Sequence, residues 1–395
     1  MAACRHRPHD TTGEKMPVEI DDLLRATEEK RASDLIIKVG VPPMVRVTGG
    51  IKALEPFPKL TQQETAALAF SIMNPHQQEK FKERCEIDFA HSVPGLGRYR
   101  VNAFMQRGTV SMVFRLIPFK IGSIRELMLP TVVEKLASEP RGMILVTGTT
   151  GSGKSTTLAS MVDYINQNRN AHIITIEDPI EFLHRDKRSV INQREVGQDT
   201  ESFATALRSA LRQNPDVILL GEMRDFETIS TALQAAETGH LVLSTLHTLD
   251  AVETINRIIA VFPPYQNKAI RLQMASVIRG IVSMRLVPTT DGKGFVPAVE
   301  ILIATQTVKE AIIDPDKTRR IHEIIAAGTS QYGMQSFDQA LHALYKKRTI
   351  TYEEAMKHST NPQDFALRVQ GIQANTESWE DNRSSEPQPV IERFS

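Results

Sequence analysis

The chain has 395 residues, 41% of them hydrophobic, which is enough for two or three domains with full hydrophobic cores. Its 47 basic and 47 acidic residues cancel to a formal net charge of zero, which disfavours a nucleic-acid-binding protein. Two cysteines, Cys4 and Cys85, exclude a disulfide scaffold or a four-cysteine zinc site and suit a reducing cytoplasm. No apolar stretch is long enough to span a membrane and the polar start does not fit a secretory signal, so we expect any membrane role to depend on a partner.

The first part of the chain has the pattern of a small α+β domain. Residues 1–15 are polar and show no hydrophobic repeat, so we expect them to be disordered ahead of a domain over 16–118. Apolar residues at helical spacing predict a helix over 18–31, and Thr61 with Glu64 forms the capping-box pattern that begins a second helix. A further helix is predicted over 76–84, and strands are predicted over 35–39, 44–48, 51–54, 99–106 and 109–117.

A predicted linker over 119–129 leads into a longer domain over 130–370. Four apolar runs, at 143–147, 172–177, 217–220 and 241–246, alternate with amphipathic helices. This alternation predicts an α/β fold in which helices cover both faces of a parallel sheet. Helices are also predicted over 320–326, 336–346 and 352–358, and the polar tail over 371–395 is expected to be disordered.

A glycine-rich stretch follows the first of these apolar runs and matches the P-loop pattern G-x-x-x-x-G-K-[ST] at every position. In such a loop, backbone N–H groups surround the phosphates of a nucleoside triphosphate, the lysine reaches the β- and γ-phosphates, and the hydroxyl binds Mg²⁺. The alternative is an ordinary strand–helix turn, but the helical spacing of the residues after the loop favours a P-loop. The predicted nucleotide contacts are Gly148, Thr149, Thr150, Gly151, Ser152, Gly153, Lys154, Ser155 and Thr156, with Ser155 as the Mg²⁺ ligand.

Three other predicted strands end in polar residues. Glu177, Glu222 and His247 each lie at or just after the carboxyl end of a strand, which in a parallel sheet is the edge that holds the P-loop. We interpret Glu222 as the residue that polarises the attacking water, with Glu177 as its rival or as a water-mediated ligand of the metal. His247 is interpreted as a sensor of the γ-phosphate.

Each of these interpretations has a structural alternative. Either glutamate could cap a helix or form an ion pair, and the histidine could be a hydrogen-bonded buried side chain. Gly221 stands where an ordinary P-loop enzyme places an aspartate, which leaves the second protein contact of the metal open.

Two arginines of the first domain are predicted to face each other. If Arg107-Gly108 is a two-residue hairpin turn, Arg100 pairs directly with Arg115 across the two strands. Like charges in this position repel, so a nearby anion would stabilise the pair. We interpret Arg100 and Arg115 as arginine fingers for the γ-phosphate of a neighbouring subunit, the alternative being two solvated surface side chains.

A further arginine set comprises Arg194 on the stretch NQREVG and Arg208 with Arg212 on a predicted helix over 202–213. Arg208 and Arg212 are one turn apart and share a helix face. We favour a structural role, in an ion-pair network with Glu177, Asp178 or Asp216, over phosphate binding.

Taken together, these motifs resemble those of the secretion-superfamily ATPases, and most closely the PilT-type twitching-motility (type IV pilus retraction) ATPases. The resemblance covers about residues 16–369. The matching blocks are GTTGSGKST at Gly148, ITIEDPIEFLH at Ile173, NQREVGQDT at Asn192, LRQNPDVILLGEMRD at Leu211, TGHLVLSTLHT at Thr238 and GMQSFDQAL at Gly333.

This resemblance implies an ATPase that uses ATP and Mg²⁺ and assembles as a homo-hexameric ring. Each subunit would join a PAS-like N-terminal domain to a RecA-like P-loop ATPase domain, with a hinge near residues 119–124. Gly221 before Glu222 is the family's own pattern, and the family's paired arginines match Arg100 and Arg115. The resemblance further implies a cytoplasmic ring at the inner membrane that turns a pilus platform protein and disassembles pilin, with no nucleic acid as partner.

The sequence departs from the family pattern in one block. Retraction ATPases usually carry A-I-R-N-L-I in the C-terminal helices, whereas this chain has Ala311-Ile312-Ile313-Asp314-Pro315. The resemblance therefore also admits a PilU-type accessory paralogue, and a paralogous retraction ATPase stands among the expected partners.

Three other functions compete with a retraction motor. A pilus-assembly or type II secretion ATPase usually has a four-cysteine zinc insertion and a longer N-terminal region, which this chain does not have. A nucleic-acid translocase requires a basic channel, which zero net charge disfavours. A non-enzymatic nucleotide switch is disfavoured because a lysine, a hydroxyl, two carboxylates and a histidine are all predicted at the phosphate site.

Overall fold

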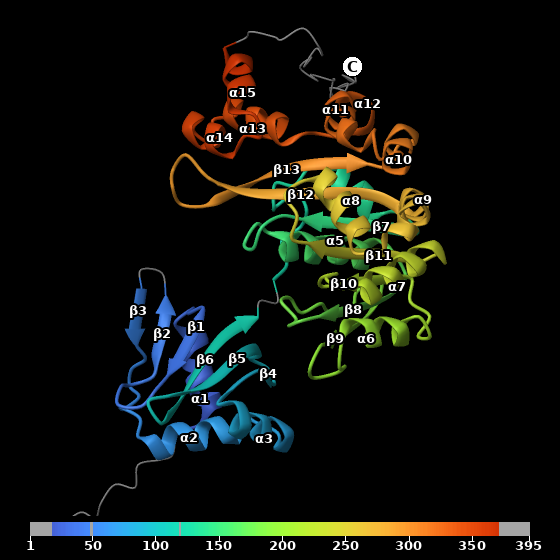
Figure 1. Cartoon of the computed structure of the whole chain (residues 1–395). Helices are drawn as coiled ribbons and strands as arrows, with labels where there is room; N and C mark the ends of the chain where they lie inside the picture. The colour runs from blue at the N-terminus through green and yellow to red at the C-terminus, as the bar shows by residue number, and fades with distance from the viewer. Residues whose placement is uncertain (1–17, 48–49, 118–119, 371–395) are drawn as a thin grey trace, which may run out of the picture. The chain divides into compact units, whose positions relative to one another are not determined.

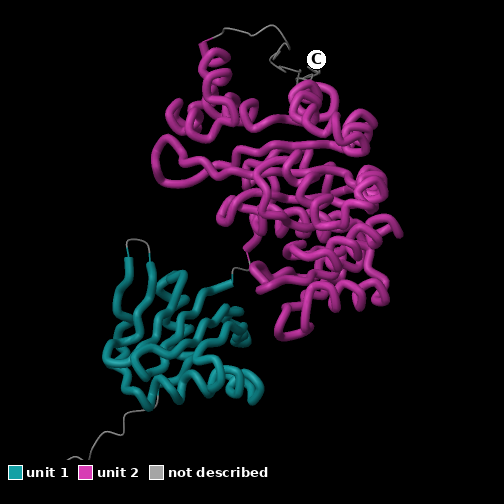
Figure 2. Tube along the Cα trace, in the orientation of Figure 1, with its two compact units in different colours: residues 1–119 teal, residues 120–395 magenta. Residues whose placement is uncertain are grey.

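The computed structural model describes residues 18–47, 50–117 and 120–370, and the chain divides into two compact units, residues 1–119 and 120–395 (Figure 2). The segments expected to be disordered, 1–15 and 371–395, lie outside the described residues, and so does the start of the expected hinge. None of the helices in the described ranges combines the length and the apolar character that crossing a bilayer requires.

Unit 1 is a six-stranded antiparallel sheet with helices, as expected for an α+β domain. The strand order is β3-β2-β1-β6-β5-β4. The strands are β1 (Asp34–Ile37), β2 (Met44–Val47), β3 (Gly50–Ala53), β4 (Glu86–Val93), β5 (Gly97–Gln106) and β6 (Thr109–Ile117), and the helices are α1 (Ile20–Glu29), α2 (Gln62–Ser71) and α3 (Pro75–Arg84). The predicted capping box at Thr61 and Glu64 is confirmed at the start of α2.

The β5–β6 hairpin has the predicted register. Arg107 and Gly108 both have positive φ angles, as a tight hairpin turn of this length requires, and Gln106 pairs with Thr109 beside them. Counting outward from that turn, Arg100 pairs with Arg115.

Unit 2 is built on a seven-stranded sheet whose order is β13-β12-β7-β11-β10-β8-β9 (Figure 1). The strands are β7 (Gly142–Thr147), β8 (His172–Glu177), β9 (Val190–Glu195), β10 (Val217–Leu220), β11 (Leu241–Leu246), β12 (Ile278–Pro288) and β13 (Phe295–Ile303). The four predicted strands are confirmed and run parallel to their neighbours, but β13 is antiparallel to β12, so the sheet is mixed rather than wholly parallel.

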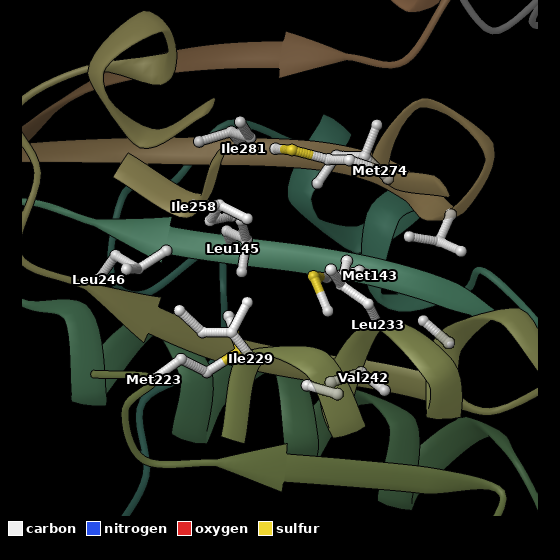
Figure 3. Close-up of a cluster of buried hydrophobic side chains, with 14 of the residues drawn as sticks. Met143, Leu145, Met223, Ile229, Leu233, Val242, Leu246, Ile258, Met274 and Ile281 are labelled. Atoms are coloured by element: carbon white, nitrogen blue, oxygen red, sulfur yellow. The ribbon is translucent and has the colours of Figure 1, made fainter. Parts of the chain in front are cut away.

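Helices cover both faces of this sheet, as predicted. They are α4 (Val132–Ala137), α5 (Lys154–Asn168), α6 (Phe203–Ala210), α7 (Phe226–Glu237), α8 (Ala251–Ala260), α9 (Asn267–Val277), α10 (Gln306–Ile313) and α11 (Ile321–Ala327). Alternate residues of β7 face opposite sides: Met143 and Leu145 pack with side chains of α7, α8 and α9 (Figure 3), whereas Ile144 and Val146 pack with those of α4 and α5. The central strands are therefore buried on both faces and hold the loops at their ends in place.

The end of the described chain forms a separate helical layer above the β12–β13 hairpin. Helices α12 (Thr329–Tyr332), α13 (Phe337–Lys346), α14 (Tyr352–His358) and α15 (Pro362–Val369) follow α11. Leu341, Ala355 and Phe365 of this layer are buried with Val287 of β12 and Val296 of β13.

Candidate active site

The polar residues predicted at the strand ends lie at one edge of the sheet. In the parallel register, Thr147 at the end of β7 pairs with Leu246 of β11, and Leu220 at the end of β10 pairs with both Ser244 of β11 and Ile176 of β8. The residues that follow these strands therefore emerge side by side. Together they line a cleft of about 480 Å³ that includes Gly151, Gly153, Lys154, Ser155, Thr156, Glu177, Glu181, His184, Gly221, Glu222, Arg224 and His247.

The P-loop wraps the N-terminus of α5. Gly153 precedes the helix with a positive φ of 94°, and Lys154 is the first helical residue. The first N–H groups of a helix have no partner within it, and together with the helix dipole they favour an anion at this end. The Lys154 ammonium is buried and donates hydrogen bonds to the carbonyl oxygens of Gly148 at 2.9 Å and Thr149 at 2.8 Å.

Gly148 occupies a position that has no room for a side chain. A Cβ atom there would lie 2.5 Å from Ser152 Oγ and 2.6 Å from the carbonyl oxygen of Met284, and the φ angle is 141°. The glycine thus lets the loop turn directly against β12. Close packing of loop backbone against the sheet is what brings the N–H groups to a common centre.

Glu177 ends β8 with its carboxylate held by three donors. Thr175 Oγ1 donates to Glu177 Oε1 at 2.6 Å, Gln193 Nε2 donates to the same oxygen at 3.2 Å, and the Glu181 N–H donates to Oε2 at 3.4 Å. Burial raises the pKa of Glu177 to about 7, although these three hydrogen bonds lower it.

Glu222 follows β10 and contacts Arg224 and His247. Its Oε1 forms an ion pair with Arg224 Nε at 2.7 Å, and its Oε2 lies 3.5 Å from His247 Nε2. The Glu222 side chain is only 18% exposed, whereas that of His247 is 47% exposed. Glu222 and His247 are therefore close to each other, as predicted. His247 is exposed, so it is not a buried, hydrogen-bonded histidine.

His240, in the same TGHLVLSTLHT stretch as His247, holds a turn together and does not line the cleft. His240 precedes β11, and its Nδ1 lies 2.9 Å from the carbonyl oxygen of Ala235 and 3.3 Å from Thr238 Oγ1. These contacts close the turn between α7 and β11.

The arginines of unit 1 have carboxylate partners within that unit. Arg115 Nε donates to Asp34 Oδ1 at 2.9 Å, and Arg100 Nε lies 3.7 Å from Asp88 Oδ1. These carboxylates relieve part of the repulsion for which the sequence suggested a bound anion. The Arg100 and Arg115 side chains are 48% and 68% exposed, so both remain accessible to an additional anion.

The structural role favoured for Arg208 has a different partner from those expected. Arg208 on α6 forms an ion pair with Glu227 on α7, rather than with Glu177, Asp178 or Asp216, because α6 packs against α7. Arg212 Nη1 donates to the carbonyl oxygen of Arg208 at 3.2 Å, and Arg194 Nη2 donates to that of Asp199 at 3.0 Å.

Several residues that line the cleft or contact its glutamates were not predicted from sequence as individual contributors. Thr175, Gln193 and Arg224 contact the two glutamates, and His184 lines the cleft. Thr175 could have been found because it lies two residues before Glu177 on the same strand and so shares its face. Gln193 could not, because the pairing of β9 with β8 was not predicted.

The residues present fit a magnesium–nucleotide complex. Mg²⁺ keeps several waters and takes few protein ligands, which matches one hydroxyl, Ser155, at the start of α5 in the same cleft as two carboxylates. Among the described residues no group of three or more His, Cys, Asp or Glu side chains could hold a metal by itself. A metal here would thus depend on the nucleotide phosphates for its other ligands.

Comparison with known proteins agrees with this geometry. Residues 120–384 match the family model described as type II/IV secretion system protein. The chain belongs to the type II/IV secretion system protein family. That family assignment covers the whole of the P-loop cleft, and it agrees with the RecA-like fold expected for unit 2 and with a smaller domain before it.

Relatives in this secretion family extend the similarity across nearly the whole chain. The type IV pilus retraction ATPase PilT of Pseudomonas aeruginosa is 45% identical over 88% of this chain and 100% of its own length. The type IV pilus ATPase PilU of the same organism is 42% identical over 93% of this chain and 95% of its own. A crystal structure of the pilus retraction motor PilT with bound ADP matches with a TM-score of 0.81 and 46% identity, over 88% of this chain and 98% of that one.

Proposed function

We propose that the protein is an ATP-hydrolysing motor that powers retraction of type IV pili. The observation that carries this proposal is the cleft itself, in which a complete P-loop faces two carboxylates and a histidine on adjacent strand ends. The full-length similarity to a pilus retraction ATPase supports the biological role, and the ADP in the related PilT structure supports the nucleotide.

In the proposed reaction, the P-loop holds the triphosphate. The backbone N–H groups of residues 149–156 bind its phosphates, and Lys154 exchanges the carbonyl oxygens of Gly148 and Thr149 for phosphate oxygens. Mg²⁺, held by Ser155, would neutralise charge that develops on the phosphates. His247, which lines the same cleft beside Glu222, would contact the γ-phosphate.

Two observations support Glu177 over Glu222 as the group that accepts the proton of the attacking water. The pKa of Glu177 lies at about 7, which suits a general base at neutral pH. Glu222, in contrast, forms an ion pair with Arg224 at 2.7 Å, so one of its carboxylate oxygens already has a partner. Glu222 would then orient the water and His247 rather than take the proton.

We also propose that the active form is a homo-hexameric ring in the cytoplasm that works on the inner-membrane pilus platform, with Arg100 and Arg115 acting on the γ-phosphate of a neighbouring subunit. Their exposure supports this role. A mixing experiment tests it. Subunits carrying Arg100→Ala and Arg115→Ala would be combined with Glu222→Gln subunits, and recovery of ATPase activity in the mixture is expected only if the arginines act in trans.

The decisive experiment for the proposed function is pilus retraction in cells that lack the protein. Retraction force or twitching zones should fall, and the wild-type gene but not a Lys154→Met variant should restore them. Purified protein should hydrolyse ATP in the absence of DNA, and an activity that required DNA would instead favour a translocase. The chain is similarly identical in sequence to PilT and to PilU, so sequence identity does not separate a main motor from an accessory one. The same cellular assay distinguishes them.

A further inference from the structure

A glutamine on the edge strand contacts three points of the loop that follows Glu177. Gln193 lies on β9, at the position paired with Thr175 of β8. Its Oε1 accepts a hydrogen bond from the main-chain N–H of His184 at 2.8 Å, and its Nε2 donates to the carbonyl oxygen of Phe182 at 2.9 Å. The same nitrogen donates to Glu177 Oε1 at 3.2 Å.

The two main-chain contacts fix which way the amide faces. A main-chain N–H can only donate and a main-chain carbonyl oxygen can only accept, so Oε1 must face His184 and the NH₂ group must face Phe182. Because both bonds are independent of Glu177, the amide presents an N–H to the carboxylate whatever else occupies the cleft.

This arrangement distinguishes the two oxygens of Glu177. Oε1 accepts from both Thr175 Oγ1 and Gln193 Nε2, while Oε2 accepts only the longer bond from the Glu181 N–H. The two donors on Oε1, of which Thr175 makes the shorter bond, restrict the carboxylate and leave lone pairs on Oε2 for a water molecule. In the proposed reaction, Thr175 and Gln193 occupy Oε1, so Oε2 is the oxygen that would act on water.

We propose that Gln193 is a positioning residue for ATP hydrolysis, which holds the Glu177 carboxylate and the loop over residues 178–184 in a single working geometry. This inference rests on the proposed role of Glu177 in hydrolysis. It goes beyond that role because it assigns a function to a residue on β9, a strand that carries none of the predicted site residues.

The charged groups around Glu177 come from every element that borders the cleft. Glu181 and His184 belong to the loop held by Gln193, and Glu195 pairs with Glu177 in the β8–β9 register. Across the cleft stand Lys154, Glu222, Arg224 and His247. Gln193 is neutral, so replacing it with an apolar side chain changes hydrogen bonding without altering the charge of this surrounding set.

The test is a double-mutant cycle on the full-length protein. Gln193→Met removes the amide at nearly constant side-chain length, and Glu177→Gln removes the carboxylate. The kcat and KM for ATP are measured by steady-state kinetics for both variants and for their combination. We expect Gln193→Met to lower kcat by about tenfold or more, because small misplacements of a reacting group have effects of that size, while the KM for ATP stays within about twofold. In the Glu177→Gln background, adding Gln193→Met should lower kcat no further.

A matched control separates positioning from loss of strand stability. Asn192 is the adjacent residue of β9, and its Nδ2 lies 2.8 Å from His172 Nε2, outside the cleft. Asn192→Met removes one hydrogen bond from the same strand and should leave kcat unchanged. If thermal unfolding shows that Gln193→Met does not fold, Gln193→Ala repeats the cycle, because it also removes the amide and adds no charge beside Glu177.

The possible outcomes test the positioning role of Gln193 separately from the proposed role of Glu177 in hydrolysis. An equal loss of kcat from Gln193→Met in both backgrounds, or no loss in the wild-type background, overturns the positioning role of Gln193. A Glu177→Gln variant with wild-type kcat overturns the proposed role of Glu177 itself.

Discussion

The Lys154 ammonium donates a hydrogen bond to the carbonyl oxygen of Gly148, six residues earlier in the chain, at 2.9 Å. A second bond, to Thr149, is 2.8 Å long. Burial lowers the pKa of Lys154, and the two carbonyl oxygens replace only part of the lost hydration. Two carbonyl oxygens of the loop thus bind the Lys154 ammonium. When a nucleotide binds, phosphate oxygens that carry full negative charge would take their place.

Lys154→Met should strongly weaken nucleotide binding without loss of fold. Removal of the cation takes away the main electrostatic attraction for the β- and γ-phosphates, and we expect affinity for ATP to fall by about 100-fold, near 3 kcal/mol. The thermal midpoint should stay level or rise, because a partly desolvated charge is removed. Fluorescent-nucleotide titration and calorimetry measure the two effects, and Lys317→Met, an exposed lysine paired with Asp314, is the matched control.

Gly148→Ala should destabilise the protein far more than Gly151→Ala. A Cβ at position 148 meets Ser152 Oγ at 2.5 Å and the Met284 carbonyl oxygen at 2.6 Å, whereas position 151 has nothing within 4 Å. We expect a cost of about 3 kcal/mol at position 148 from overlap and strain, and about 1 kcal/mol at 151 from its positive φ alone. Similar unfolding midpoints for the two variants would show that the loop can move away from β12.

The rate of ATP hydrolysis should fall as pH is lowered through about 7. Glu177 must be ionised to accept a proton, and burial raises its pKa to about 7, so the active fraction decreases on the acid side of that value. Glu177→Gln should lower kcat by about 100-fold or more and remove this limb of the pH profile. A wild-type profile that is flat between about pH 6 and 8 would argue against Glu177 as the proton acceptor.

The sequence was most informative where structure is decided locally. The P-loop, the strand ends at Glu177, Glu222 and His247, and the register of Arg100 with Arg115 all follow from short motifs and from the period of the flanking strands. Each of these features depends on a short stretch of sequence, of which the longest is the hairpin from Arg100 to Arg115, so no knowledge of tertiary packing was needed.

What could not be predicted depends on distant segments. Strand β9 is an edge strand whose Asn192, Gln193 and Arg194 lack the apolar pattern of a buried strand, so its pairing with β8 and the contact of Gln193 with Glu177 were missed. The β12–β13 hairpin was missed as well, and Arg279, Ser283 and Arg285 interrupt its apolar run. The partner of Arg208 was wrong because only the packing of α6 on α7 brings Glu227 close.

Another buried carboxylate, on β13, lies away from the cleft and gives the protein a pH-dependent stability. Glu300 on β13 has a side chain that is 4% exposed. Its Oε1 accepts the main-chain N–H of Ala251 at 2.9 Å, and His322 Nδ1 lies 4.0 Å from Oε2. Burial raises the pKa of Glu300 from 4.5 to about 7, and the bond from Ala251 opposes that rise.

The sign of the effect follows from proton linkage. Since the folded state holds the Glu300 proton more tightly than the unfolded state, this group favours folding below about pH 4.5, and its contribution is lost as pH rises through about 7. The difference of about 2.5 between the two pKa values corresponds to roughly 3 kcal/mol across that window.

Glu300→Gln should therefore be more stable than the wild type at pH 8 and nearly equal to it at pH 5. The amide keeps an oxygen for the Ala251 N–H and cannot ionise, so the variant should lose most of the decline in stability with rising pH that this site causes. Glu177 contributes a decline of the same sign in both proteins, so only their difference reports on Glu300. Calorimetric midpoints at several pH values measure it, with Glu323→Gln as the control because its side chain is 72% exposed. Parallel curves for wild type and Glu300→Gln would show that Glu300 stays ionised in the folded protein, stabilised by its cationic neighbours.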